Sequence, residues 1–145
     1  MGHVIGFRRL EFRGAQVSAE HVASGAHLLA DLHGVPASLL RDDATLQALL
    51  IRAATAANAR VLFSHFHAFG DGGGITGVVL LAESHISIHT WPEHGFAAVD
   101  IFMCGGAHPA RALQLIERGL GATGCVRRSV PRGIDSLPGV DNRVA

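Results

Sequence analysis

The chain has 145 residues and no formal net charge, and 48% of its residues are hydrophobic against 17% that are charged. This length fits a single domain over residues 1–145 with a core of its own, and the neutral charge excludes the attraction that a nucleic-acid-binding protein needs. No apolar run approaches the roughly 18 residues that span a bilayer, so we expect neither a membrane nor a nucleic acid as partner.

The cysteines and the N-terminal residues indicate the cellular compartment in which the protein is expected. Cys104 and Cys125 could form one bridge, but a chain of this size does not need one. Arg8 and Arg9 are not followed by the apolar segment of a secretory signal. We therefore expect a cytoplasmic protein with free thiols.

The first third of the chain predicts one strand and one helix. Residues 1–23 are weakly patterned, and we treat them as an extension without a predicted element. Residues 26–32 predict a strand. Asp42 or Asp43 is a suitable N-cap for a helix. The apolar residues of this helix follow a helical stripe, at Leu46, Leu49, Leu50, Ala53 and Ala57.

A glycine-rich loop separates the next two predicted strands, at residues 60–66 and 75–82. The loop, residues 70–74, reads Gly-Asp-Gly-Gly-Gly. A match to G-x-G-x-x-G begins at Gly72, but the dinucleotide fingerprint must open a helix, and a β-like segment follows here. We interpret the glycines as a loop that approaches something closely or stays mobile.

A predicted β-hairpin follows, with strands at residues 85–91 and 96–104 and a turn at 92–95. Both strands alternate between two sides, as a strand with one buried face does. The apolar side comprises Ile86, Ile88, Ala97, Val99, Ile101 and Met103.

The remainder predicts a second helix and a last strand. The helix begins at about His108 and can stop at Gly119 or Gly121. Residues 125–130 predict the strand, and a partly ordered tail starts at Pro131. The order β-α-β-β-β-α-β predicts an α+β two-layer sandwich, in which helices cover one face of a mainly antiparallel sheet.

The register of the hairpin brings distant polar residues together. If the turn is correct, the opposite pairs include His89 with Ala98, Ser87 with Asp100, and Glu83 with Cys104. These groups lie on the face away from the helices, together with Trp91, Phe96 and Phe102. Apolar surface of this kind usually marks an interface. We therefore expect a homodimer with sites between facing sheets.

Taken singly, the polar residues of the hairpin are weak signals. Ser84 beside a glutamate is uninformative, and a histidine such as His89 on a strand is more often structural than catalytic. Cys104 is most simply an inert small core residue. Trp91 would ordinarily belong to the core and Glu93 to a solvated turn. Purely structural roles for these residues do not explain why they all occur together within about twenty residues of sequence.

The ten histidines raise a metal-binding alternative. His65 and His67 share one strand face, and with His85 or His89 they could bind zinc or iron as barrel proteins do. The sequence lacks the spaced third and fourth ligands that would make this pattern strong. We therefore predict no metal and keep the metal-binding barrel as an alternative.

Residues 81–105 read Leu-Ala-Glu-Ser-His-Ile-Ser-Ile-His-Thr-Trp-Pro-Glu-His-Gly-Phe-Ala-Ala-Val-Asp-Ile-Phe-Met-Cys-Gly. This segment resembles the signature of the prokaryotic S-adenosylmethionine decarboxylases, which are pyruvoyl enzymes of polyamine synthesis. Weaker similarity extends through residues 27–34, 66–69 and 76–77. The α+β sandwich of that family agrees with the element order above. The glycine loop is one residue longer than in typical relatives.

The resemblance implies that the bond between Glu83 and Ser84 cuts itself, giving chains 1–83 and 84–145. The Ser84 hydroxyl would attack the preceding carbonyl, and elimination and hydrolysis would leave a covalent pyruvoyl cofactor at residue 84. This group would form a Schiff base with the amine of S-adenosylmethionine and act as an electron sink while carbon dioxide leaves. The turn at residues 82–85 has no Gly, Pro or Asn, so we expect strain there that cleavage relieves.

The same resemblance implies roles for residues outside the cleavage site. His89 would give acid-base assistance in processing, and the hydroxyl of Thr76 would polarise the carbonyl. Cys104 would return a proton to the α-carbon of the substrate. An aromatic pair would stack on the adenine and a carboxylate would hold the ribose hydroxyls, from Trp91, Phe69 and Glu93.

Two further functions remain as alternatives. The first is a pyruvoyl-dependent decarboxylase of ornithine or arginine with the same fold, but such a small amino acid has no use for the stacking ring of Trp91 or the carboxylate of Glu93. The second is an unprocessed, non-catalytic homologue that regulates an active partner. The presence of Ser84, His89 and Cys104 argues against this second alternative.

Overall fold

The computed structural model describes residues 23–134. Six strands, two α-helices and two short 3-10 helices follow one another in this range: β1 (Ser24–His33), η1 (Leu39–Arg41), α1 (Asp43–Ala56), β2 (Val61–Ala68), β3 (Ile75–Leu81), β4 (His85–Trp91), η2 (Pro92–His94), β5 (Phe96–Cys104), α2 (Pro109–Leu120) and β6 (Gly124–Gly133). Each strand and helix predicted from the sequence is present, but four strands lie between the two helices and not the three of the order β-α-β-β-β-α-β.

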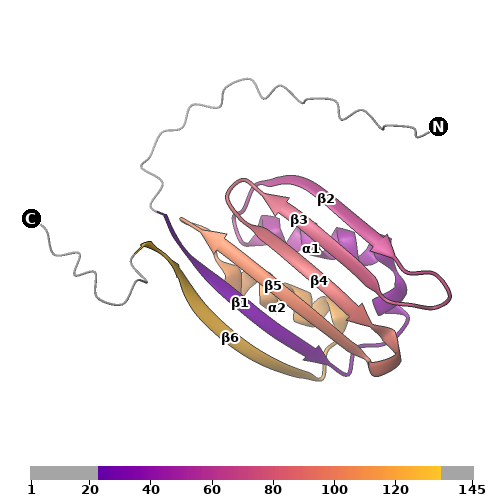
Figure 1. Cartoon of the computed structure of the whole chain (residues 1–145). Helices are drawn as coiled ribbons and strands as arrows, with labels where there is room; N and C mark the ends of the chain where they lie inside the picture. Colours follow the sequence, from indigo (N-terminus) through magenta and orange to yellow (C-terminus); the bar gives the residue numbers. More distant parts are fainter. Residues whose placement is uncertain (1–22, 135–145) are drawn as a thin grey trace, which may run out of the picture.

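The strands form one sheet in the order β2-β3-β4-β5-β1-β6, and all neighbouring strands are antiparallel. Both helices lie on the same face of this sheet (Figure 1). The predicted α+β two-layer sandwich is therefore confirmed. The opposite face of the sheet carries no helix in the described part of the chain, and we call it the open face.

The core lies between the sheet and the helices. The predicted apolar side of the hairpin is buried there, with Ile86, Ile88 and Ile101 fully inaccessible to solvent. The apolar stripe of α1 packs against it, and α1 also contacts α2. Period-two burial in β4 and β5 thus decides which side chains reach the open face.

The helix ends follow the predicted signals. The side chain of Asp42 caps α1 by accepting a hydrogen bond from the backbone N–H of Thr45 (3.0 Å), which satisfies one of the unpaired donors of the first turn. His108 precedes α2, whose first residue is proline. Gly121 ends α2 in the left-handed conformation with φ of 62°, whereas Gly119 lies within the helix and is not its stop.

The last strand is longer than the sequence predicted. It does not stop at Val130, because β6 continues to Gly133 and Pro131 pairs with Ala26 of β1. A proline is tolerated there because β6 is an edge strand with one neighbour only. The extension before Ala23 and the tail after residue 134 lie outside the described residues.

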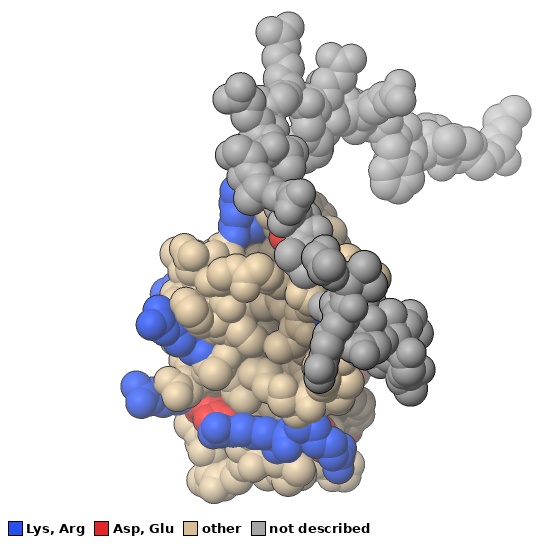
Figure 2. Space-filling model, turned by 90° about the vertical axis from the view of Figure 1, so that its left-hand side faces the viewer, with Lys and Arg blue, Asp and Glu red and all other residues tan. Residues whose placement is uncertain are grey.

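Figure 2 shows arginine side chains on one side of the molecule, with an acidic group beside some of them. Within residues 23–134, neither helix is long and apolar enough to cross a membrane.

The open face is unusually apolar for a surface in contact with water. Its pairing register places several large apolar side chains there, each at least 40% exposed: Phe63, Leu80, Trp91, Val126 and Val130. They are spread over both edges and the centre of the sheet. Exposed apolar surface of this extent usually marks an interface.

Thr90 is a buried polar residue whose hydroxyl connects β4 to η1 and to β3. Its Oγ1 donates to the carbonyl oxygen of Leu40 (2.8 Å) and accepts from the backbone N–H of Ile75 (2.7 Å). Thr90→Val would leave both partners without their hydrogen bond, so we expect the free energy of unfolding to fall by about 2–4 kcal/mol. Urea denaturation measures this change, in a Ser84→Ala background in which we expect the chain to stay whole.

Thr55→Val is the matched control for this prediction. Thr55 is exposed on α1, and its hydroxyl bonds only to the carbonyl of Ile51, one turn earlier. Its replacement should change stability by less than about 0.5 kcal/mol. Equal stability losses in the two variants would show that the buried hydroxyl of Thr90 has no special role.

Candidate active site

A cleft of about 210 Å³ opens where the glycine loop meets the ends of β3 and β4. It is lined by Phe69, Gly73, Gly74, Ile75, Thr76, His89, Thr90, Trp91 and Glu93. Five of these residues were predicted from the sequence as processing or substrate-binding residues. The structure therefore brings Phe69, Thr76, His89, Trp91 and Glu93 together in one cleft.

Thr76 and His89 form a polar pair at the floor of this cleft. They are directly opposite in the β3–β4 ladder, and Thr76 Oγ1 lies 3.1 Å from His89 Nδ1. The ring of His89 also lies 6.5 Å from that of Trp91, centre to centre. A hydroxyl in contact with an imidazole can be activated by it for proton transfer. The geometry of this pair suits acid-base chemistry at the cleft.

Aromatic rings form the walls of the cleft. Trp91 is 40% exposed and packs against Phe96, with ring centres 5.3 Å apart. Phe69 is 53% exposed and contacts the ring of His67 at 4.8 Å. Two exposed aromatic rings at one cleft offer faces on which a planar group can stack.

Glu83 and Ser84 lie at the other end of β4, in the turn between β3 and β4. The carbonyl oxygen of Ser84 accepts from the backbone N–H of Leu81 (2.9 Å), and the N–H of Ala82 donates to Arg60 (3.0 Å). Among the described residues, the non-glycine residues with positive φ are Asn58 and Asp71. The expected backbone strain at residues 82–85 is therefore not found, because this turn is closed without a left-handed residue.

Cys104 lies beside Glu83, as the predicted register requires. The ladder between β4 and β5 runs from Trp91–Phe96 to His85–Phe102, and its continuation places Cys104 opposite Glu83. Burial raises the pKa of the Cys104 thiol, and the nearby carboxylate of Glu83 raises it further. The thiol therefore keeps its proton at neutral pH and can serve as a donor rather than a nucleophile.

The two groups of predicted residues are separate within one chain. Ser84 and His89 are five residues apart along an extended segment, which corresponds to about 16 Å. The hairpin therefore does not bring Ser84 and His89 together within one chain. One end of β4 carries Glu83, Ser84 and, from β5, Cys104; the other end carries the cleft.

The model of the family described as S-adenosylmethionine decarboxylase matches residues 26–133 of this chain. The chain belongs to the S-adenosylmethionine decarboxylase family. All the residues predicted above as site residues fall within the matched segment, which also includes both helices and all six strands except the first two residues of β1.

Individual members of the S-adenosylmethionine decarboxylase family agree with this match. The S-adenosylmethionine decarboxylase proenzyme of Sulfurihydrogenibium sp. (strain YO3AOP1) is 45% identical over 111 residues, which cover 76% of this chain and 83% of that protein. The proenzyme of Caldanaerobacter subterraneus subsp. tengcongensis is 39% identical over 117 residues, covering 80% and 94%. The crystal structure of the adenosylmethionine decarboxylase from Aquifex aeolicus VF5 superposes with a TM-score of 0.70 at 41% identity, covering 78% and 93%.

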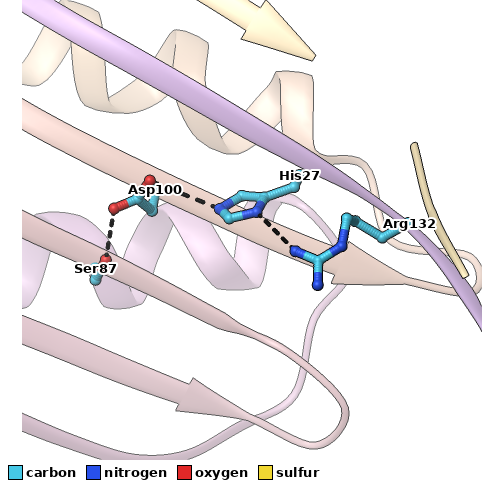
Figure 3. A network of polar contacts seen from close by, with 4 residues as sticks. All are labelled: His27, Ser87, Asp100 and Arg132. Carbon is cyan, nitrogen blue, oxygen red and sulfur yellow. Dashed lines mark hydrogen bonds and ion pairs between the residues drawn. The ribbon is translucent and has the colours of Figure 1, made fainter. Parts of the chain in front are cut away.

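The sequence did not reveal a polar network that crosses the open face of this family member (Figure 3). Ser87 Oγ donates to Asp100 Oδ2 (3.3 Å), and Asp100 Oδ1 lies 3.6 Å from His27 Nε2. On its other side, His27 Nδ1 lies 3.4 Å from Arg132 Nη1. Arginine can only donate, so Nδ1 is the acceptor, whereas the buried Nε2 has no hydrogen-bond partner among the described residues and is only within ion-pair distance of Asp100.

This network connects four strands through their side chains. Ser87 opposite Asp100 was predicted from the hairpin register, but His27 and Arg132 join from β1 and β6, whose positions in the sheet no local pattern reveals. The ring of His85, next to Ser84 in sequence, packs at 6.1 Å from that of His27. Burial, with a further contribution from His27 and against the effect of Asp100, lowers the pKa of His85.

The histidines do not assemble a metal centre in the described part of the chain. No group of three or more His, Cys, Asp or Glu side chains in residues 23–134 is arranged to hold a metal ion. His65 and His67 do share the open face, as predicted, because each is paired with an open-face residue of β3. The metal-binding alternative gains no support from their surroundings.

Proposed function

We propose that this protein is a self-processing S-adenosylmethionine decarboxylase, which supplies decarboxylated S-adenosylmethionine as the aminopropyl donor for polyamine synthesis. The observation that carries the proposal is that two groups of functional residues, which we call half-sites, lie at opposite ends of β4 on one sheet face in a member of this family. One half-site has the serine and thiol for forming and using a covalent cofactor, and the other has a cleft for a nucleoside. The relatives named above are proenzymes, which agrees with processing of the chain.

Processing would use groups of the chain alone. Ser84 Oγ attacks the carbonyl carbon of Glu83, the peptide C–N bond breaks, and the chain is joined by an ester. Loss of the Ser84 α-proton then expels the Glu83 carboxylate and leaves a dehydroalanine. This tautomerises to an imine, and water releases ammonia to give the pyruvoyl group. His89 and Thr76, already in contact at 3.1 Å, are suited to move the proton and polarise the carbonyl.

The surroundings of Ser84 fit a pyruvoyl group. Ser84 is half-buried and lies in a turn, outside the strand pairing. Cys104, whose thiol is protonated, lies nearby. When present, the group supplies a ketone that condenses with the substrate amine and withdraws the electrons released as carbon dioxide leaves. Cys104 then holds the proton that the α-carbon must receive.

The cleft supports a nucleoside substrate rather than a simple amino acid. Trp91 and Phe69 provide stacking faces for adenine, and the sulfonium cation of S-adenosylmethionine favours aromatic surroundings. Glu93 at the cleft can accept paired hydrogen bonds from ribose hydroxyls. Ornithine or arginine would leave these contacts unused.

A homodimer would join the two half-sites. His89 must act on Ser84, but the two lie about 16 Å apart in one chain. If two open faces meet around a twofold axis near the middle of β4, the Ser84 end of each protomer faces the cleft of its partner. The same arrangement would cover the exposed apolar side chains of the open face. Each complete site would then contain Ser84 and Cys104 of one protomer and the cleft of the other.

Release of carbon dioxide from carboxyl-labelled S-adenosylmethionine tests the activity directly. The proposal expects turnover with this substrate and background rates with ornithine and arginine. Faster release from either amino acid would overturn the substrate assignment while leaving the pyruvoyl chemistry intact. Absence of release from all three by fully cleaved protein would overturn the activity itself.

Cys104→Ala should process normally but turn over poorly. Removal of a general acid typically costs about 10²–10⁴-fold in kcat, while cleavage does not use the thiol. In the wild type, activity requires the protonated thiol, so it is lost as the pH rises through the thiol pKa, which burial and Glu83 have raised. We expect Cys104→Ala to lack this alkaline loss in a kcat–pH profile.

Cys125→Ala is the control, because Cys125 lies on β6 and packs against the core on the helix side. It should keep both the rate and the alkaline loss of activity. A Cys104→Ala variant with the wild-type kcat and pH profile would remove Cys104 from the mechanism.

A further inference from the structure

Two hydrogen bonds connect the 3-10 helix η1 to the two walls of the cleft. Thr90 Oγ1 donates to the carbonyl oxygen of Leu40 (2.8 Å), and Thr90 immediately precedes Trp91. Arg41 Nε donates to the carbonyl oxygen of Gly72 (2.8 Å), in the loop that begins after Phe69. One turn of helix therefore contacts the segment that holds each aromatic ring.

The wall that carries Trp91 is rigid without further help. Trp91 ends a strand with neighbours on both sides, and its ring packs on Phe96. The backbone at Thr90 is also closely packed, since a Cβ on Gly74 would overlap the carbonyl oxygen of Thr90. The position of this wall is therefore fixed by the sheet.

Phe69 packs on the ring of His67 (4.8 Å), but the loop that follows it has fewer constraints than the strand that carries Trp91. Four of the five residues at 70–74 are glycines, which lose more freedom on ordering than any other residue. Gly72 and Asp71 both have positive φ, 77° and 59°. The loop's own backbone bonds are Phe69 N–H to Gly74 (2.9 Å) and Gly73 N–H to Gly70 (3.2 Å). Within the described residues, Arg41 makes the only side-chain hydrogen bond to positions 70–73.

We infer that Arg41 is a positioning residue for substrate binding, which holds the glycine loop so that Phe69 stays at the cleft that Trp91 also lines. This inference rests on the proposed function, because it concerns the same cleft and a planar nucleoside base as its occupant. Arg41 is suited to this task because it lies on η1, which is itself hydrogen bonded to β4. From there its guanidinium reaches the backbone carbonyl of Gly72, 31 residues further along the chain. Its partner is a main-chain atom, so it holds the loop regardless of loop side chains.

Loss of this hydrogen bond should affect binding and spare processing. Without Arg41 the loop samples more conformations, so ordering Phe69 against the base costs free energy at the moment of binding. We expect a KM about three- to tenfold higher, with kcat nearly unchanged. Cleavage should proceed normally, because Thr76 and His89 are held by the β3–β4 ladder and not by the loop.

The experiment compares Arg41→Ala, Arg41→Lys and the control Arg52→Ala, in which an exposed arginine of α1 is removed. Trp91 is the only tryptophan of the chain, so its fluorescence reports on the cleft. Each cleaved protein is titrated with 5′-methylthioadenosine, a nucleoside without an amine that could react. Arg41→Ala should bind it about three- to tenfold more weakly; Arg41→Lys, which keeps a donor, should recover part of the loss; Arg52→Ala should match the wild type.

The possible outcomes separate this inference from the proposed function. Wild-type nucleoside affinity in Arg41→Ala, with wild-type KM for S-adenosylmethionine, would overturn the role of Arg41 while leaving the decarboxylase intact. A changed kcat with an unchanged KM would overturn it as well. Wild-type protein that cleaves but neither binds the nucleoside nor decarboxylates S-adenosylmethionine would instead overturn the function proposed for the cleft.

Discussion

Ser84→Ala is expected to leave the chain whole and to reduce decarboxylation below about one thousandth of the wild-type rate. Alanine has no hydroxyl to attack the carbonyl of Glu83, so neither the ester nor the ketone can form. Intact mass under denaturing conditions would show the uncut chain, and release of labelled carbon dioxide would give the rate.

Ser87→Ala is the matched control on the same face. Ser87 is the next open-face serine of the hairpin, and its hydroxyl is hydrogen bonded to Asp100 instead of lying beside a scissile bond. This variant should still be cut between residues 83 and 84. Cleavage of Ser84→Ala, or equal loss of cleavage in both variants, would show that the hydroxyl of Ser84 is not the attacking group.

Co-expression of Ser84→Ala with His89→Ala should restore cleavage that neither variant shows alone. In the proposed dimer, the Ser84→Ala protomer of a mixed pair would still provide a cleft with His89, and this cleft would face the intact Ser84 of its partner. We therefore expect the His89→Ala chain to be cut and the Ser84→Ala chain to stay whole. With random pairing, half of the dimers are mixed and each has one complete site, so activity should reach about a quarter of the wild type.

The control for this experiment replaces the first partner with the double variant Ser84→Ala, His89→Ala. This partner dimerises through the same face but has no imidazole at position 89, so the His89→Ala chain should remain uncut. An uncut His89→Ala chain in the first mixture as well, with mixed dimers present, would contradict assembly of the site across two protomers.

The sequence was sufficient for the elements that local patterns determine. Period-two alternation identified the buried side of β4 and β5, and Ile86, Ile88 and Ile101 are fully buried as predicted. The turn before Gly95 fixed the hairpin register, which the Ser87–Asp100 pair confirms. Capping chemistry limited the N-cap of α1 to Asp42 or Asp43 and the end of α2 to Gly119 or Gly121, and the structure selects Asp42 and Gly121.

The sequence was insufficient where distant strands meet. β1 lies between β5 and β6, and the pairing of His27 with Phe102 and Val130 joins segments far apart in the chain. Such contacts depend on which strand edge remains free after the hairpin forms, and no local periodicity encodes this. The network through His27 and Arg132 could therefore not be predicted.

The same limit applies to the site itself. The resemblance supplied the identity of the residues, and the register placed Cys104 near Glu83. The resemblance named Ser84 and His89 for one site without giving the distance between them. Only the extended geometry of β4 separates them, and this separation is what favours a shared site in a dimer.

The intact mass of the purified wild-type protein under denaturing conditions tests the central claim most directly. We predict two fragments, residues 1–83 and residues 84–145, with the second lighter by one ammonia than a peptide that begins with serine. A single full-length chain in protein that is folded and dimeric would contradict it.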